Sequence, residues 1–193
     1  MARKKYEFRP DRTRSNILSR LMPTRQQRMN LLKWGLYIAL LLLASVLQDV
    51  VLCKVQLFGA TTDLVPYLII LICIRRGADR SAIFCLISAM MYKFSGTAPG
   101  YYVIALLPLL AMPAAMVHQS YFRKSLGSTM LCACTAILLY ELCVLLFGLG
   151  LGYTTAARAG RFLITGLLSV AVCPILYPIT NAIEKIGEKT WKD

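Results

Sequence analysis

Residues 31–183 form an almost unbroken series of apolar runs separated only by short polar turns. This pattern constrains the fold more than any motif does, because a soluble domain cannot cover so much apolar surface. The 193-residue chain is 58% hydrophobic and has a mean hydropathy of +0.60. We therefore predict an all-α integral membrane protein in three parts: a basic tail over 1–30, a membrane domain over 31–183 and a short tail over 184–193.

Six apolar runs predict six transmembrane helices. The runs at 31–52, 99–117, 128–151 and 160–183 are long enough to cross a bilayer. Prolines at 108 and 113 predict a kink in the fourth helix, and prolines at 174 and 178 predict one in the sixth.

The runs at 64–74 and 81–92 are shorter, and about 17 Å of helix falls short of roughly 30 Å of hydrocarbon. They cross only by using their flanks, with Thr62 or Asp63 as the N-cap of the first helix and Asp79 as the cap of the second. Arg75 and Arg76 are expected to reach outward to the headgroups. The alternative is a re-entrant hairpin that does not cross.

The distribution of basic residues predicts the orientation. With six crossings, all but four of the 22 lysines and arginines fall on the side of the N-terminus. Basic residues mark the cytoplasmic side, so both termini are predicted to be cytoplasmic. The net charge of +13 comes largely from residues 1–33 and indicates attraction to anionic lipid rather than to nucleic acid. Within this tail, residues 15–22 predict either a surface-lying amphipathic piece or part of a disordered segment.

Glu141 is the residue most open to a functional interpretation. It falls near the middle of the 128–151 run, where a charge costs at least about 2.5–3.5 kcal/mol. We expect it to face the interior of the bundle. There it either contacts a ligand, a proton or a partner helix, or is a neutral carboxyl that fixes helix packing.

Three further charged residues, Asp49, Asp63 and Lys93, fall near the outer ends of the first three helices. Together with Arg158 and Arg161 they either line the mouth of an outward-facing cavity, or cap helices at the membrane interface and extend their charged groups into water.

The residues needed for catalysis are lacking. The chain has one histidine and nine scattered acidic residues, and it has no glycine-rich phosphate loop. Its seven cysteines form no Cys-x-x-Cys pair and fit reduced, apolar packing. We therefore expect no enzyme activity, no cofactor and no metal.

The segment between 47 and 102 carries a family resemblance. Its motifs are Leu47-Gln48, Gly59…Asp63-Leu64, Arg76-Gly77 and Gly96…Pro99-Gly100-Tyr101-Tyr102. In these motifs and in hydropathy the chain resembles the rod-shape-determining MreD family of bacteria. It departs from that family at Thr62, where a proline is usual. It also departs at 88–93, where the usual Gly-Leu-Leu-Leu-Asp is replaced, so the role of that family's acidic residue does not carry over.

The resemblance implies a non-catalytic subunit of the cell-elongation machinery in the bacterial cytoplasmic membrane. Such proteins bind the single-span scaffold MreC and help to coordinate cytoskeletal filaments with the glycosyltransferase and transpeptidase that build peptidoglycan. We expect the contacts to be made by the outer loops 52–62 and 95–102 and the adjoining helix ends. The candidate partner-binding or pocket residues are Gln48, Asp49, Asp63, Lys93, Gly96, Gly100, Tyr101 and Glu141.

The alternative function is the substrate-binding subunit of an energy-coupling-factor vitamin transporter, whose six-helix fold MreD proteins resemble. That class docks its partner through an Ala-x-x-x-Ala stripe on the first helix. Here Ala39 and Ala44 are five residues apart, which places them on different faces of a helix.

Overall fold

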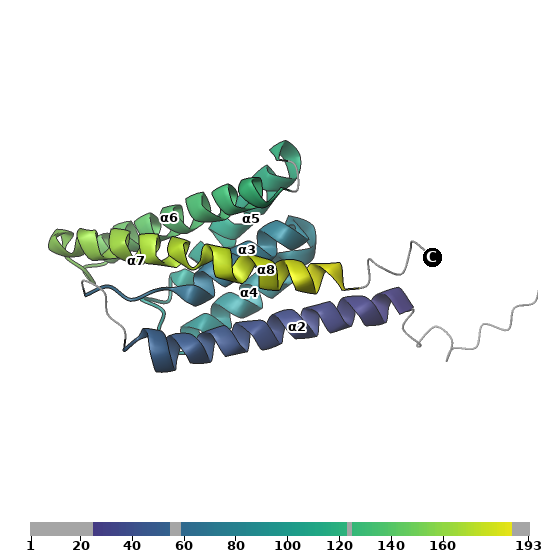
Figure 1. Ribbon diagram of the computed structural model, residues 1–193. Helices are drawn as coiled ribbons and strands as arrows, with labels where there is room; N and C mark the ends of the chain where they lie inside the picture. Colours follow the sequence, from purple (N-terminus) through teal and green to yellow (C-terminus); the bar gives the residue numbers. More distant parts are fainter. Residues whose placement is uncertain (1–24, 55–58, 123–124, 187–193) are drawn as a thin grey trace, which may run out of the picture.

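The computed structural model describes residues 25–54, 59–122 and 125–186. Most of the predicted N-terminal tail, including 15–22, lies outside these residues, as does 187–193 of the C-terminal tail. The regular elements are helices throughout, and the described residues contain no strand (Figure 1). The prediction of an all-α chain is confirmed over this part of the sequence.

The bundle is built from seven α-helices within the described ranges (Figure 1). Helix α2 (Arg25–Leu47) continues into a π-helical turn, η1 (Gln48–Leu52). It is followed by α3 (Leu64–Arg76), α4 (Ala78–Phe94), α5 (Val103–Tyr121) and α6 (Leu126–Gly150). A 3₁₀ turn, η2 (Ala156–Arg158), then leads into α7 (Ala159–Ala171) and α8 (Cys173–Lys185).

Three helical stretches are long and apolar enough to cross a membrane: Gln27–Leu52, Val103–Tyr121 and Leu126–Gly150. A fourth span results if α7 and α8, which are bent by 48° at the start of α8, count as one. Pro174 lies at this break, where its ring and missing N–H interrupt the helical ladder. The helix predicted over 160–183 is therefore two helices, and α2 begins at Arg25 rather than at residue 31.

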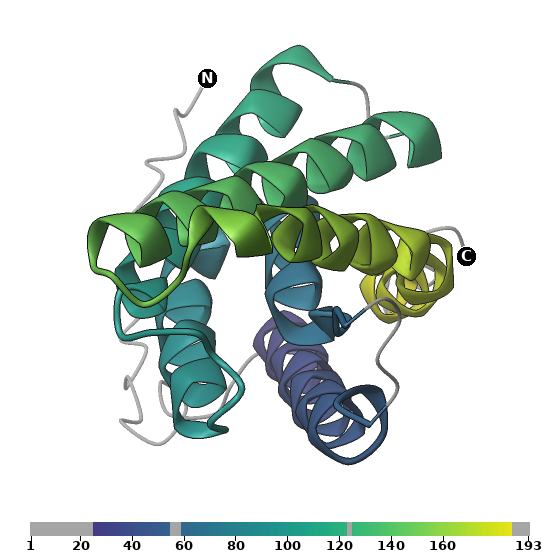
Figure 2. The same cartoon turned by 90° about the vertical axis from the view of Figure 1, so that its left-hand side faces the viewer.

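Helix α3 lies at the centre of the bundle, although it is one of the shortest helices. Every residue from Leu64 to Ile74 is buried. Figure 2 shows α3 among the other helices, and it contacts α2, α4, α5, α6, α7 and α8. A helix that is apolar on all sides is stable only when protein or lipid surrounds it. Here protein surrounds it.

Helices α3 and α4 form a tight antiparallel hairpin. Gly77 alone separates them, with φ +89°, a conformation that side chains other than glycine rarely adopt. Helix α4 returns to the start of α3, where the Tyr92 hydroxyl lies 3.5 Å from Asp63 Oδ2. At the turn, the Arg76 guanidinium lies 5.0 Å from the ring of Trp34 in α2. The hairpin therefore extends along α2 from Gln48 to Trp34.

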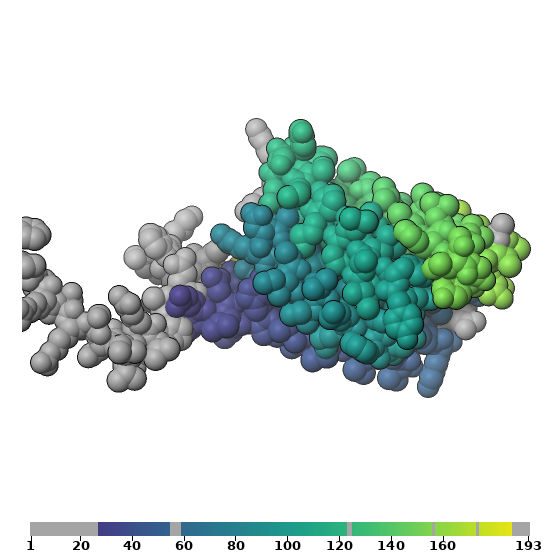
Figure 3. All heavy atoms as spheres, turned by 180° about the vertical axis from the view of Figure 1, so that it is seen from behind, coloured from purple at the N-terminus to yellow at the C-terminus, as the bar shows by residue number. Residues whose placement is uncertain are grey.

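Large apolar side chains cover much of the outer surface. The back of the molecule, formed largely by α4 and α5, is seen in Figure 3. The exposed apolar residues of α4 and α5 include Ile83, Ile87, Leu109 and Met116, and α2 and α6 contribute many more. An apolar exterior around a packed interior is what a helical bundle in lipid requires.

Candidate functional site

Two polar clusters lie at opposite ends of the bundle. We call them the Gln48 end and the Arg76 end. The Gln48 end comprises the last turns of α2, α4 and α6 and the first turns of α3, α5 and α7. The Arg76 end comprises the first turns of α2, α4 and α6 and the last turns of α3, α5 and α8. The candidates predicted from sequence belong to the Gln48 end, with Glu141 deeper in the bundle.

Gln48 joins α2 to α3. Its Oε1 accepts the backbone N–H of Val65 at 2.9 Å, and its Nε2 donates to Asp63 Oδ1 at 3.3 Å. The side chain is buried, with the residue only 2% exposed. The first turn of a helix has N–H groups without intrahelical acceptors, and here a residue from another helix supplies one. Asp63, one of the two residues expected at the N-cap, holds that position, but its side chain makes no capping hydrogen bond.

Asp63 lies where four segments meet. Its backbone N–H donates to Ser169 Oγ of α7 at 3.0 Å, and its carboxylate accepts from Gln48 and, at 3.5 Å, from Tyr92 of α4. Burial raises the pKa of this carboxyl to about 7, and the hydrogen bond from Tyr92 opposes that rise. Asp63, which directly precedes α3, thus contacts the η1 turn that continues α2 and the last turns of α4 and α7.

Glu141 faces the interior, as expected. It is 3% exposed, and its Oε1 has no hydrogen-bond partner among the described residues. The neighbouring Tyr140 hydroxyl is likewise buried and without a partner in that part of the chain. The charge of Asp63 is close enough to act on both residues. The structure therefore groups Gln48, Asp63 and Glu141 around one polar interior region.

Gly166 of α7 permits the close approach of α6 at this point. A Cβ at this position would lie 3.3 Å from Cγ of Glu141 and 3.1 Å from Cδ2 of Leu138. Helices approach this closely where one of them presents a small residue. The position of Glu141 therefore depends on a glycine that sequence reasoning did not select.

The other candidates lie nearer the surface of the Gln48 end. Asp49 is exposed, and the ammonium of Lys93 lies 4.4 Å from the ring centre of the exposed Tyr101. Gly96 is an exposed turn residue with φ +85°, and Gly100 is buried against the ring of Tyr102.

Tyr102, rather than Tyr101, attaches the 95–102 turn to α6. Its ring stacks on Phe147 with 5.7 Å between ring centres, and its hydroxyl donates to the Val144 carbonyl at 3.5 Å. Gly100 makes room for this ring, because a Cβ there would overlap it. The adjacent tyrosines thus have different positions: one is packed against α6 and the other is exposed.

Sequence reasoning missed Ser169 and Tyr92, the two residues of α7 and α4 that contact Asp63. Polar residues inside apolar runs were the available signal, because such groups are retained in lipid-facing bundles where they find internal partners. Which of them meet across the bundle depends on helix rotation, and the sequence does not give that rotation.

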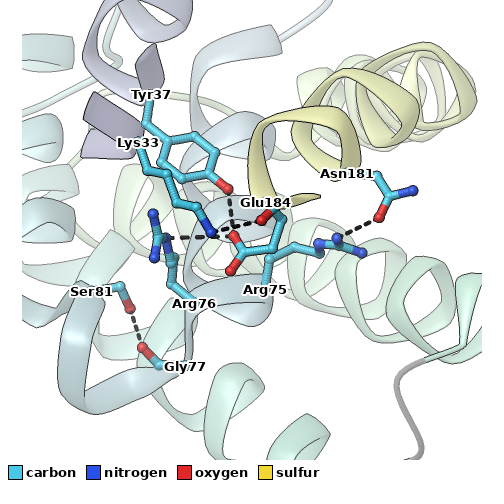
Figure 4. Close-up of polar contacts among 8 residues, drawn as sticks. All are labelled: Lys33, Tyr37, Arg75, Arg76, Gly77, Ser81, Asn181 and Glu184. Atoms are coloured by element: carbon cyan, nitrogen blue, oxygen red, sulfur yellow. Dashed lines mark hydrogen bonds and ion pairs between the residues drawn. The ribbon is translucent and has the colours of Figure 1, made fainter. Parts of the chain in front are cut away.

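The Arg76 end is organised around Glu184 of α8 (Figure 4). Its Oε2 accepts from the hydroxyl of Tyr37 at 2.8 Å and lies 3.5 Å from Nε of Arg76, while its backbone carbonyl accepts from Lys33 at 2.7 Å. The Arg76 guanidinium also lies over the rings of Trp34 and Tyr37. Arg76 was expected to reach outward, but it is buried and paired, so that expectation is wrong.

Arg75 is held differently from Arg76. Its Nη1 donates to the Tyr177 hydroxyl at 3.1 Å and its Nη2 to Asn181 Oδ1 at 2.7 Å, and the guanidinium lies 5.2 Å from the Tyr177 ring centre. All these partners are neutral groups of α8. These hydrogen-bond partners supply no counter-charge to Arg75; Figure 4 shows the contact with Asn181.

In both clusters, hydrogen bonds between side chains, or between side chains and the backbone, join different helices, and the Arg76 end adds an ion pair between α3 and α8. Within the described ranges, no three His, Cys, Asp or Glu residues are grouped so that they could hold a metal ion. In comparisons with known proteins, no family model, no curated protein and no solved structure matches the chain.

Proposed function

We propose that this protein is a non-catalytic, multi-pass subunit of the bacterial cell-elongation machinery that binds an MreC-like single-span scaffold. In this proposal all six predicted helices cross the cytoplasmic membrane, with α7 and α8 together as the sixth. Both termini are cytoplasmic, so the Gln48 end faces outward. The elongation-specific glycosyltransferase and transpeptidase are further partners, contacted directly or through the scaffold.

The architecture of the Gln48 end is the observation that carries this proposal. Two of the residues that give the resemblance to MreD proteins make its structural contacts: Gln48 caps α3, and Gly100 accommodates Tyr102. Buried side chains of Gln48 and Glu141 occupy the interior behind this end. Such an end is suited to rigid contact with a partner.

Three aromatic side chains are exposed on the surface of the Gln48 end, where a partner could contact them. Phe94, Tyr101 and Tyr153 are 86%, 81% and 69% exposed. Phe94 is the last residue of α4, Tyr101 precedes α5, and Tyr153 follows α6. Aromatic residues dominate the energetics of protein interfaces, although they also gather where a membrane meets water. We propose that these three residues, together with Lys93, form the scaffold contact.

The test replaces Phe94, Tyr101 and Tyr153 together with alanine in the host. Because all three are exposed, the variant should be inserted and folded but should lose co-purification of the single-span partner, and the cells should become round. A matched control replaces Leu131, Leu139 and Leu142 with alanine, since these exposed apolar residues of α6 lie before its last turns and away from the Gln48 end. Rod-shaped cells on complete depletion of the protein would contradict the proposal.

One observation favours the alternative of a vitamin-binding transporter subunit. The buried Glu141 Oε1, Tyr140 hydroxyl and Thr154 hydroxyl have no hydrogen-bond partners in the described part of the chain. A small polar ligand could supply partners for them. Against this, Ala44 is buried and Ala39 is exposed, so they do not form one docking stripe. Co-purification of an ATPase pair, with a vitamin retained in the bundle, would favour this alternative over the scaffold-binding function.

A further inference from the structure

A cavity of about 760 Å³ lies at the Arg76 end, away from the polar interior described above. Helices α3, α4, α5, α6 and α8 all contribute to its walls. In Figure 1, the first turns of α6 and the last turns of α8 lie apart at this end of the bundle. The volume is in the range of small-molecule sites.

The lining is polar and carries excess positive charge. Arg75, Arg80 and Lys185 line it, and none of them has a carboxylate within 4.0 Å among the described residues. Arg76 and Glu184 also border it, but they neutralise each other as an ion pair. Asp79 is the remaining acid in the lining. The cavity therefore has a net positive charge that the described residues leave unbalanced.

Arg75 is pre-organised to bind an oxyanion. Two of its five N–H groups are used by Tyr177 and Asn181, which fix the plane of the guanidinium. Because Tyr177 and Asn181 are neutral, they orient the Arg75 guanidinium without neutralising its positive charge. A guanidinium held in place in this way loses little freedom when it binds, and its planar fork matches the oxygens of phosphate. Amide side chains of Gln119 and Asn181 also border the cavity and add polar groups.

The position of the cavity suits a phosphate group at a membrane surface. It lies at the end where Trp34 and Lys33 flank the apolar part of α2. Tryptophan and lysine commonly mark the headgroup level, and basic pockets between helices on the cytoplasmic side bind anionic headgroups.

We propose that this cavity binds a phosphate-bearing anion through Arg75, Arg80 and Lys185. The phosphate belongs either to an anionic phospholipid headgroup or to a free phosphate, and the two sources share the same recognition chemistry. This site is independent of the function proposed above, because it uses neither the Gln48 end nor a partner protein.

The experiment measures thermal unfolding of the full-length protein in dodecyl maltoside. Micelles are supplemented with dioleoyl phosphatidylglycerol, with zwitterionic dioleoyl phosphatidylcholine, or with inorganic phosphate, each titrated to give an apparent Kd. The test variant is R80Q with K185Q, both exposed positions where substitution leaves packing unchanged. The control is K54Q with R158Q, which removes the same charge from exposed positions at the Gln48 end.

The expected result is stabilisation by phosphatidylglycerol but not by phosphatidylcholine, with the Kd about 25-fold weaker in the R80Q/K185Q variant and unchanged in the control. The factor follows from roughly a fivefold contribution of each basic residue. R75K keeps the positive charge but replaces the planar guanidinium with an ammonium group, so it should also weaken binding. If inorganic phosphate reproduces the stabilisation and the dependence on Arg80 and Lys185, the source is a free phosphate. If only the lipid does so, the source is a headgroup.

Three results would overturn the site. They are the absence of any stabilisation, equal stabilisation by both lipids, and equal weakening in the test and control variants. The last would mean that the overall charge of the protein, rather than the cavity, attracts the anion. Far-ultraviolet circular dichroism and size-exclusion chromatography of each variant ensure that these outcomes are compared among folded proteins.

Discussion

The side-chain oxygen of Gln48 accepts the backbone N–H of Val65 at 2.9 Å, so a residue of the η1 turn, which continues α2, caps the first turn of the central helix α3. Gln48 and the start of α3 at Leu64 are separated in the sequence by residues 49–63. The start of α3 is therefore fixed by tertiary structure rather than by the residue at its own N-cap.

Replacing Gln48 with leucine should lower the free energy of unfolding by about 1–3 kcal/mol. Leucine is of similar size, but it leaves the buried Val65 N–H without an acceptor and removes the donor to Asp63. The loss is measured by thermal unfolding in detergent. The matched control is Asp49→Asn at the exposed neighbouring position, which should change stability little. Equal effects at the two positions would contradict the capping role.

The stability of the protein should depend on the ionisation of Asp63. Its pKa is raised from 3.8 to about 7, because burial disfavours the charged form. The folded state therefore holds this proton more tightly than the unfolded state does. The resulting stabilisation is complete below about pH 4 and is lost as the pH rises through 7.

Asp63→Asn should flatten this pH dependence between pH 4 and 8 while keeping an oxygen for Gln48. The groups that face Asp63 are Gln48 of the η1 turn, Tyr92 of α4, Ser169 of α7 and, through its charge, Glu141 of α6. Glu141→Gln is therefore measured in parallel, to separate the contribution of that second carboxyl. An unchanged pH profile in Asp63→Asn would assign the dependence to another group.

Gly77→Ala should destabilise the α3–α4 hairpin by about 1–3 kcal/mol. The residue has φ +89°, and the amide of Gln119 fills the space that a Cβ would need. Adding Gln119→Ala should recover only part of the loss, because the backbone strain remains. Gly35→Ala in α2 is the control, since a Cβ there meets nothing within 4 Å. That change should be neutral or stabilise the helix by up to about 1 kcal/mol.

Removing Glu184 alone should lower the free energy of unfolding more than removing both Glu184 and Arg76. Glu184→Ala leaves the buried Arg76 guanidinium, whose side chain is 5% exposed, without a counter-charge. The expected loss is about 3 kcal/mol, because breaking one half of a buried pair strands the other charge. The double variant Arg76→Met with Glu184→Ala should be more stable than Glu184→Ala alone. A double variant that is less stable would show that Arg76 is held mainly by Trp34 and Tyr37.

Hydropathy and length predicted the helices well, because an apolar run long enough to cross a bilayer has few alternative structures. Pro174 likewise marked the bend that divides α7 from α8. The interior position of Glu141 followed from the cost of a charge in lipid.

Partners across the bundle were not predictable in the same way. Arg76 resembles any arginine at the end of a membrane helix, and its burial depends on Glu184 arriving from α8. The central position of α3 depends equally on the other helices. A short apolar run predicts either a marginal crossing or a buried helix, and only the arrangement of its neighbours distinguishes the two.

The central position of α3 has a consequence for the synthesis of the protein. Helix α3 leaves the ribosome before α5, α6, α7 and α8, which cover it. The carboxylate that Tyr37 bonds lies 147 residues further along the chain. Until α8 has been made, the nascent protein holds an unneutralised Arg76 and an unenclosed helix. Chains released too early would therefore display these features to chaperones and proteases, which gives the cell a physical means to tell an interrupted product from a finished one.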